Sequence, residues 1–457
     1  MSSSSPAPAR GHARGPSTDE RRRAPAVVTR RSTKGPLDAD FNPLSDGPAP
    51  APSAAAARSP QPSLRANSPA ASLSTPSANL EKDFSHLLHP GNFHPLPPQT
   101  IPQPFLSSGH QPHASTPLHD LLANGHYRLA ASAAANALLK ETLPSDHEKI
   151  FELLYVRLAC LSLLNQHALA AAEAKPLGDL SSAFYRHPLT GAHLVPWELR
   201  VLAVRLMGLG YGDWRRGVMG YYELAREARL EAIRAQNTEA KQTWKNRLLD
   251  LGIRVANALI EMGECEGAAR HLTTLGPAES SKTADEAEPT PRTPEKSRLK
   301  TMEVLTWLRV GDVDAAKRSV AASSLPSPPT PSTADAAPPV DPLNALIAMA
   351  EGDYTSALTV WEALAAQNPA DHMIAQNRAV CLLYVGRITD ARDALERVID
   401  EAQDSCVAFH ALTFNLSTIY ELCTERARDR KFELVEKVAA MEPSAMGWER
   451  QAADFKL

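Results

Sequence analysis

Aromatic residues and cysteines are scarce in this 457-residue sequence. Phe, Trp and Tyr together make up 5% of it, and the five cysteines stand alone at positions 160, 265, 381, 406 and 423. Because no Cys-x-x-Cys pair and no closely spaced Cys/His pair occurs, we expect neither a disulfide framework nor a zinc site, and a reducing, cytosolic setting fits best. No apolar run of about 18 residues occurs, so no membrane span is predicted.

Motifs of catalytic sites are also missing. The sequence has no Gly-x-x-x-x-Gly-Lys-Ser/Thr phosphate loop, no Gly-x-Ser-x-Gly elbow, no His-Glu-x-x-His and no dinucleotide fingerprint. Five histidines, at positions 86, 89, 94, 110 and 113, lie in Pro-rich sequence that offers a metal no fixed geometry, and a soluble polar segment explains them as well. The prediction is a protein that is not an enzyme and has no cofactor, with an enzyme of unrecognised site as the alternative.

The charges are nearly balanced, with 48 Lys and Arg against 52 Asp and Glu and a formal net charge of −4. Residues 1–116 hold 11 basic and 7 acidic residues, so the remainder is mildly acidic. A nucleic-acid partner is not expected, because phosphate binding needs a basic face. The basic run Arg21–Arg23, continued by Arg30, Arg31 and Lys34, could be a nuclear address, a contact to anionic membranes or solubilising charge.

Proline divides the chain, since 21 of its 38 prolines precede residue 118 and 11 lie between 277 and 342. We therefore predict disorder in residues 1–116, in a loop at 276–297 and in an inserted loop at 321–340. Helical repeats are expected at 117–275 and tetratricopeptide repeats at 298–441, followed by a polar tail at 442–457 that contains Trp448. The apolar residues between Leu80 and Leu106 form either a lead-in to the fold or a recognition peptide that docks on a partner or back on this chain.

Hydrophobic residues outside these segments recur with helical spacing. One predicted helix follows a capping box formed by Ser145 and Glu148, and its apolar face consists of Ile150, Leu153, Leu154, Leu158 and Leu161. No stretch alternates apolar and polar residues as a half-buried strand does. The sequence therefore predicts an all-α protein.

A six-residue frame returns after 34 residues, the period of the tetratricopeptide helical hairpin. In the first copy Gly352 is followed by Tyr354 and Ala357, and in the second Gly386 is followed by Ile388 and Ala391. Glycine permits the tight turn between the two helices, and the small alanine lets the second helix approach the first. Trp361 and Pro369 fill the aromatic and closing-proline positions of the motif.

Weaker copies of the frame begin at Gly125, Asn165, Gly212, Gly263 and Gly311. A single hairpin cannot bury its apolar face, so neighbouring hairpins must stack. The predicted fold is thus a tetratricopeptide-repeat-like solenoid of helical hairpins with a long disordered N-terminal region.

Two stretches of the sequence, residues 195–226 and residues 414–422, resemble a known family. Residues 195–202 read Val-Pro-Trp-Glu-Leu-Arg-Val-Leu, residues 215–226 read Arg-Arg-Gly-Val-Met-Gly-Tyr-Tyr-Glu-Leu-Ala-Arg, and residues 414–422 read Phe-Asn-Leu-Ser-Thr-Ile-Tyr-Glu-Leu. This pattern resembles the subunit 12 family of the transport protein particle (TRAPP) tethering complex, over roughly residues 118 to 441.

The resemblance implies a non-catalytic scaffold subunit that assembles with the large subunits 8 and 11. The complex tethers vesicles in ER-to-Golgi traffic and autophagy, and its small core subunits exchange nucleotide on a Ypt/Rab-type GTPase, which would be an indirect partner. The implied location is cytoplasmic, peripheral at Golgi and ER–Golgi intermediate membranes.

For the partner surface, the stretch from Tyr211 to Arg226 is favoured, because Trp, Tyr and Arg are the side chains most enriched at binding hot spots. The candidate contact residues are Trp214, Arg215, Arg216, Tyr221 and Tyr222. In the alternative, Trp214 and Tyr221 are core residues and the arginine pair is merely solvated. An alternative function is a co-chaperone adaptor that binds C-terminal peptides. Asn377-Arg378-Ala379 resembles one corner of its carboxylate clamp, but the neighbouring helices lack the lysine and asparagine that would complete it.

Overall fold

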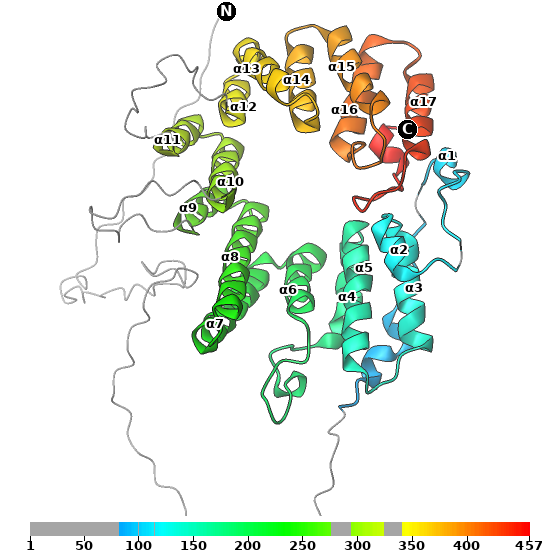
Figure 1. The fold of residues 1–457 in the computed structure, drawn as a ribbon, viewed down its shortest axis with the longest axis vertical. Helices are drawn as coiled ribbons and strands as arrows, with labels where there is room; N and C mark the ends of the chain where they lie inside the picture. Colours follow the sequence, from blue (N-terminus) through cyan, green and yellow to red (C-terminus); the bar gives the residue numbers. More distant parts are fainter. Residues whose placement is uncertain (1–81, 99, 114, 276–293, 324–340) are drawn as a thin grey trace, which may run out of the picture. The chain divides into compact units, whose positions relative to one another are not determined.

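The computed structural model describes residues 82–98, 100–113, 115–275, 294–323 and 341–457 (Figure 1). Within these ranges the regular elements are helices, and the only pairing of β type is two isolated bridges, Arg186 with His193 and Asp404 with Glu442. The predicted all-α fold class is confirmed.

The helices form consecutive antiparallel pairs in which each helix packs against the next. The first helices of the pairs are α2 (Leu118–Ala123), α4 (His147–Leu163), α6 (Trp197–Tyr211), α8 (Thr238–Glu261), α10 (Pro294–Val310), α12 (Pro342–Ala350), α14 (His372–Tyr384) and α16 (His410–Cys423). The second helices are α3 (Tyr127–Lys140), α5 (His167–Ala174), α7 (Trp214–Arg234), α9 (Cys265–Leu275), α11 (Val313–Ser323), α13 (Tyr354–Gln367), α15 (Ile388–Asp400) and α17 (Ala427–Ala440). Shorter elements are α1 (Gln103–Leu106) and the 3-10 turns η1 (Ser85–Leu88), η2 (Pro90–Asn92), η3 (Lys175–Leu177), η4 (Ala183–Tyr185) and η6 (Ala452–Phe455).

The turns inside seven of these pairs follow the six-residue frame of the sequence. In each, the residue at the glycine position has a positive φ, from 58° at Asn165 to 92° at Gly386, and the second helix begins two residues later. The residue at the alanine position is buried in all seven frames, as at Ala357 and Ala391. Trp361 is fully buried, and Pro369 follows the end of α13.

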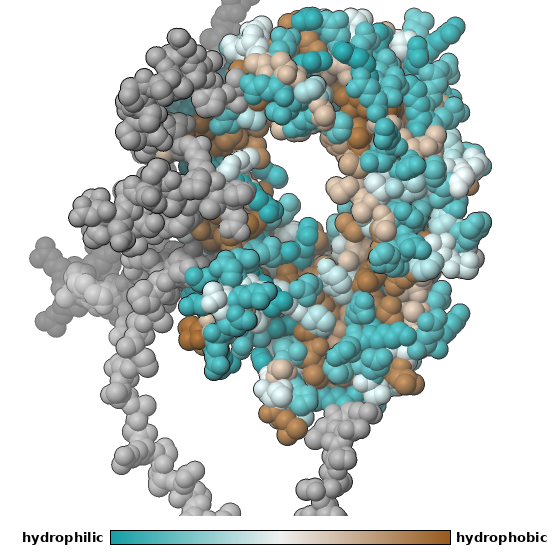
Figure 2. All heavy atoms as spheres, in the orientation of Figure 1, coloured by the Kyte–Doolittle hydropathy of each residue, from teal (hydrophilic) through white to brown (hydrophobic). Residues whose placement is uncertain are grey.

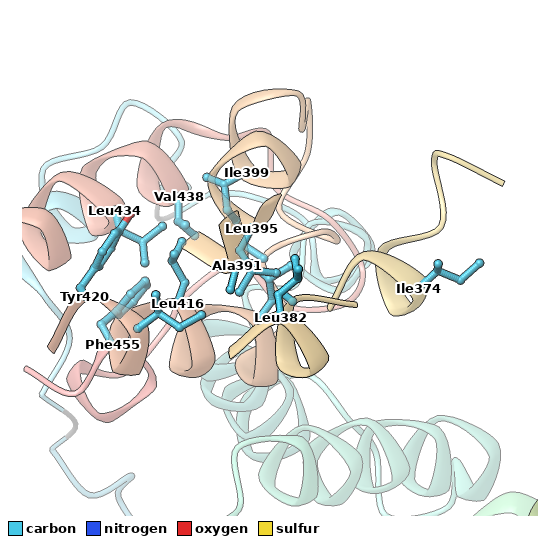
Figure 3. Close-up of a cluster of buried hydrophobic side chains, with 14 of the residues drawn as sticks. Ile374, Leu382, Ala391, Leu395, Ile399, Leu416, Tyr420, Leu434, Val438 and Phe455 are labelled. Carbon is cyan, nitrogen blue, oxygen red and sulfur yellow. The ribbon is translucent and has the colours of Figure 1, made fainter. Parts of the chain in front are cut away.

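The largest hydrophobic core lies between α12 and α17 (Figure 3). Its side chains come from successive helix turns, so each helix presents one apolar stripe to its neighbours. Leu395 of α15, Leu416 and Tyr420 of α16, and Leu434 of α17 meet in this core. Separate cores form between α3 and α6 and between α6 and α9.

The prediction of disorder up to residue 116 is wrong for the described residues from 82 onward. Phe84 is fully buried beside Phe151 of α4, with ring centroids 5.2 Å apart, and Phe105 is fully buried in the core of the last helices. Large aromatic side chains bury enough apolar area to hold a Pro-rich segment in place, which composition alone does not reveal. This part of the chain docks back on its own fold, whereas residues 1–81 lie outside the described range.

The prediction of a polar tail at 442–457 is also corrected, because Trp448 and Phe455 are fully buried. The Trp448 ring lies 5.3 Å from the Phe105 ring and 5.3 Å from the His126 ring. A Cβ at Gly125 would lie only 2.3 Å from the Ser444 carbonyl oxygen, so the turn of the first hairpin contacts the last residues of the chain.

Two smaller boundaries differ from the prediction. The N-cap of α4 is Asp146, not Ser145, because the Asp146 side chain accepts a hydrogen bond of 3.1 Å from the Lys149 amide. Helix α10 begins at Pro294, which shortens the predicted loop at 276–297. Residues 276–293 and 324–340 lie outside the described residues, and the loops predicted there stay predictions.

Candidate protein-interaction site

The five predicted contact residues share the first half of α7 but differ in exposure. Tyr221 is buried in the core between α6 and α9, with 3% of its surface exposed, and packs there as a core residue. Trp214 and Tyr222 are half-buried against the same core. Arg215 and Arg216 are exposed. Of the predicted set, the arginine pair is therefore the part that a partner can reach fully.

A glycine turn and a helix cap form the corner between α6 and α7, directly before these arginines. Gly212 ends α6 with a φ of 71°, and its amide donates to the Gly208 carbonyl over 2.9 Å. The Asp213 side chain then caps α7 by accepting from the Arg216 amide over 3.0 Å. Because a Cβ at Gly208 would lie 2.2 Å from the Trp214 ring, only glycine lets this ring pack across the end of α6.

Arg216 lies at the rim of a groove bounded by α5, η3, α6 and the start of α7. The groove has a volume of about 490 Å³. Its floor is aliphatic and consists of Ala171, Ala174, Ala203, Leu206 and Met207. Its rim is polar and includes Lys175, Asp179, Tyr211, Asp213 and Arg216. We refer to these residues as the α5–α7 groove.

A close contact between α5 and α6 forms one wall of the α5–α7 groove. A Cβ at Gly210 would lie 2.2 Å from the Ala171 Cβ, so the two helices approach more closely than any larger residue would allow. The Tyr211 hydroxyl donates to the Ala171 carbonyl over 2.9 Å and holds the end of α6 against α5. Tyr211 remains 56% exposed.

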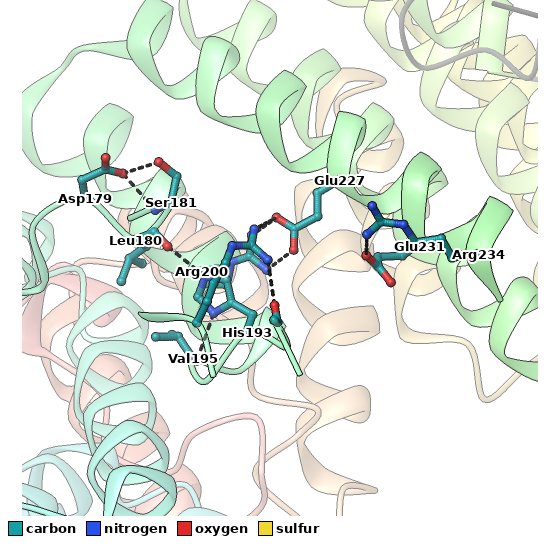
Figure 4. A network of polar contacts seen from close by, with 11 residues as sticks. Asp179, Leu180, Ser181, His193, Val195, Arg200, Glu227, Glu231 and Arg234 are labelled. Atoms are coloured by element: carbon teal, nitrogen blue, oxygen red, sulfur yellow. Dashed lines mark hydrogen bonds and ion pairs between the residues drawn. The ribbon is translucent and has the colours of Figure 1, made fainter. Parts of the chain in front are cut away.

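A polar network holds the segment between η4 and α6 against α6 and α7 (Figure 4). Arg200 of α6 donates two hydrogen bonds to the Glu227 carboxylate of α7, at 3.1 and 2.5 Å, and Arg186 lies 3.5 Å from the same group. Burial alone would raise the pKa of Glu227, but the hydrogen bonds and positive charge of these arginines outweigh it and lower that pKa. Glu227 therefore stays ionised and connects α7 with α6 and with the segment that contains Arg186.

His193 completes this network in its neutral form. Its Nδ1 accepts from the Val195 amide over 3.0 Å, so the proton is on Nε2, which lies 2.8 Å from the Leu180 carbonyl oxygen. Burial and the positive charge of Arg200 lower the pKa of His193. None of these contacts was predictable from the sequence, because the segments that make them meet only in the folded chain.

The acidic groups at the groove rim accept hydrogen bonds within the chain, whereas the basic groups form no ion pair in the described part of the chain. Asp213 caps α7, and Asp179 accepts from the Ser181 hydroxyl over 2.7 Å and from its amide over 2.9 Å, which lowers the pKa of Asp179. Lys175 and Arg216 are exposed and form no ion pair with any residue that the structure describes. The rim thus carries two cations without an ionic partner among the described residues and two carboxylates that accept hydrogen bonds within the chain, beside an aliphatic floor.

Other exposed features are more dispersed. On the face drawn in Figure 2, hydrophilic residues cover most of the described surface and hydrophobic ones lie in separate small areas. Leu189 and Ile233 are the most exposed large apolar residues in the described ranges. None of the helices in those ranges is long and apolar enough to cross a membrane, and no group of three potential metal ligands gathers there.

In the alternative function, Asn377 belongs to one corner of a carboxylate clamp. In the structure, its side chain forms contacts within its own helix. The Asn377 side-chain amide donates to the Met373 carbonyl over 3.0 Å and also contacts the Met373 sulfur. The amide is therefore already occupied one helical turn away, and this arrangement does not favour a carboxylate clamp.

Comparison with known proteins agrees with the repeats and with the resemblance. The sequence model of the tetratricopeptide repeat family matches residues 348–413, which contain the frames at Gly352 and Gly386. Trafficking protein particle complex subunit 12 of Mus musculus is 26% identical over 329 residues, which cover 66% of this chain and 39% of the relative. The chain is similar to this subunit of the trafficking protein particle complex. The resemblance predicted from sequence is thereby confirmed.

Subunit 12 of Homo sapiens is 24% identical over 325 residues, which cover 66% of this chain and 42% of the relative. The chain thus spans about two fifths of the length of the curated relatives that it matches. Among solved structures, a tetratricopeptide repeat protein from Parabacteroides merdae is similar with a TM-score of 0.33 and 13% identity, over 63% of this chain and 90% of that chain.

Proposed function

We propose that this protein is a non-catalytic helical-repeat scaffold subunit of a multisubunit vesicle-tethering complex that acts in ER-to-Golgi traffic and autophagy. Its direct partners would be other subunits, especially the large subunits 8 and 11, and a Ypt/Rab-type GTPase would be served indirectly through the exchange-factor core. The cytoplasmic face of Golgi and ER–Golgi intermediate membranes is the proposed location. The similarity to subunit 12 across 66% of the chain carries this proposal.

A scaffold role also fits the chemistry of the α5–α7 groove. Its floor is aliphatic, and its two carboxylates are engaged in a helix cap and a turn. Stacked helical hairpins bind partners through extended surfaces and need no reaction centre.

Affinity purification of the tagged full-length chain from its native cell tests the assignment. We expect the small exchange-factor subunits and the large subunits to copurify in constant proportion, as identified by mass spectrometry. Recovery of the intact chain without any of these subunits would contradict the proposed function.

The double substitution Arg215→Glu and Arg216→Glu tests whether the start of α7 contributes to partner binding. We expect the partners to be lost from the purified complex while the helical circular dichroism and the melting temperature stay nearly unchanged. Folding should be maintained because acidic side chains in the first turn of a helix interact favourably with its dipole.

The matched control is Lys241→Glu with Lys245→Glu, which makes the same change of charge at two exposed positions of α8. This variant should retain all partners. Equal retention by both variants would show that the arginine pair does not lie in the interface.

A further inference from the structure

The α5–α7 groove combines an apolar floor with unpaired cations, and this combination restricts what can occupy it. Lys175 and Arg216 have no ionic partner among the described residues, whereas Asp179 and Asp213 are held by hydrogen bonds within the chain. An occupant with carboxylates at its edges and aliphatic side chains between them would be complementary to both features. A basic or wholly apolar occupant would leave the two cations without partners.

The groove is more open than a site for a small molecule. Pockets for such ligands bury most of the ligand surface. Here the rim residues Lys175, Gly178, Asp179, Tyr211, Asp213 and Arg216 are all exposed. An occupant in contact with them would keep one side in solvent, as a segment of a larger protein does.

The walls of the groove favour a helix over an extended segment. They are formed largely by α5 and α6, whose backbone groups are bonded within the helices, and the α6 end is closed by the amides of Gly212 and Asp213. An extended peptide gains affinity by pairing with a free backbone edge, whereas a helix satisfies its own backbone and uses only side chains. Resting on the proposed function, we propose that the α5–α7 groove binds an amphipathic helix of another subunit, with aliphatic side chains on the floor and Asp or Glu beside Lys175 and Arg216.

Photo-crosslinking in the assembled complex tests this proposal. Tyr211 of the full-length chain is replaced by p-benzoylphenylalanine, and the complex is purified, irradiated and analysed by mass spectrometry. We expect a crosslink to one partner segment in which apolar residues recur every three or four positions and Asp or Glu flanks them. The same photoreactive residue at Tyr384, which is exposed on α14 and outside the groove, should not give that crosslink.

Charge reversal provides the second measurement. With Lys175→Glu and Arg216→Glu, the yield of the Tyr211 crosslink should fall on the order of tenfold, since both cations then repel the acidic helix. The Lys241→Glu and Lys245→Glu variant should keep the full yield. Circular dichroism and melting temperature of each variant verify that the fold is retained.

The outcomes separate this inference from the proposed function. If the tethering subunits copurify but Tyr211 gives no crosslink, or crosslinks to a basic or non-amphipathic segment, the groove proposal is wrong and the proposed function stands. A Tyr211 crosslink that is unaffected by the charge reversal would overturn the acidic character of the occupant. If no tethering subunit copurifies, both proposals fail.

Discussion

Arg157 and Glu173 form an ion pair inside the N-terminal hairpins, with side-chain exposures of 3% and 0%. Arg157 donates to both carboxylate oxygens over 2.9 and 2.7 Å, and its remaining donors reach the carbonyls of Ala131 over 3.0 Å and His94 over 2.8 Å. The His94 amide in turn donates to Glu173 over 2.9 Å. These two side chains therefore connect α3, α4 and α5 with the segment that precedes the repeats.

Replacing Glu173 by Gln would leave the buried guanidinium without its counter-charge. Removal of one partner of a buried pair is strongly destabilising, so we expect the free energy of unfolding to fall by about 3 kcal/mol. Denaturant unfolding of the two proteins measures the difference. The control Glu266→Gln, in an exposed pair with Arg270, should change it by less than about 0.5 kcal/mol.

Buried histidines should make stability depend on mildly acidic pH. Burial lowers the pKa of His126, His193 and His271, so the unfolded chain binds protons more readily than the folded chain. Their stabilising contribution is then present above the unfolded pKa of about 6.5 and is lost as the pH falls below it. Melting temperatures measured from pH 7.5 to 5.5 should decrease, and His271→Gln should flatten the decrease; a melting temperature that rises on acidification would contradict this assignment.

At the scale of the helices, the hairpin turns depend on backbone conformation more than on side-chain contacts. Gly386 has a φ of 92°, and a Cβ placed there would meet no atom within 4 Å. Gly386→Ala should therefore lower the free energy of unfolding by about 1–2 kcal/mol through backbone strain alone. The same substitution at Gly267, inside α9 and equally open, should instead raise it by about 0.5 kcal/mol, because alanine favours the helix. Equal effects at the two sites would rule out this explanation.

Helix pairs of this kind were predictable because the information is local. Glycine or asparagine at the turn, a bulky residue two positions later and a small residue after five positions located the start of seven second helices, including α5 after Asn165 and α7 after Gly212. The α5–α7 groove was not predictable in this way. Gly208 and Gly210 act there by admitting Trp214 and Ala171, and those contacts exist only once separate helices have packed.

Long-range packing also explains the wrong predictions at both ends of the repeats. Phe105 lies among prolines and Trp448 lies in a polar segment. Composition therefore indicated disorder for Phe105 and solvent exposure for Trp448. In the folded protein each supplies the other with an apolar neighbour. Such a pairing has no signature in either segment alone.

At the scale of the whole described region, Trp448 joins the first helices to the last. Trp448→Ala should lower the free energy of unfolding by about 3–5 kcal/mol, the range for removing a fully buried large aromatic side chain. It should also speed amide hydrogen exchange in residues 100–127, although these lie far away in sequence. Met446→Ala, at a position that is 72% exposed, should do neither; unchanged exchange in residues 100–127 of the Trp448 variant would contradict the contact.

An open array of repeats frays from its outermost hairpins, because each of these has one neighbour and every inner hairpin has two. In this chain the turn at Gly125 is covered by the residues around Gly447, and the Ala452 amide donates to the Thr100 carbonyl over 2.9 Å. The first hairpin consequently cannot open without also breaking contacts made by the last residues of the chain. Unfolding at the two termini of the array should then be a single cooperative event.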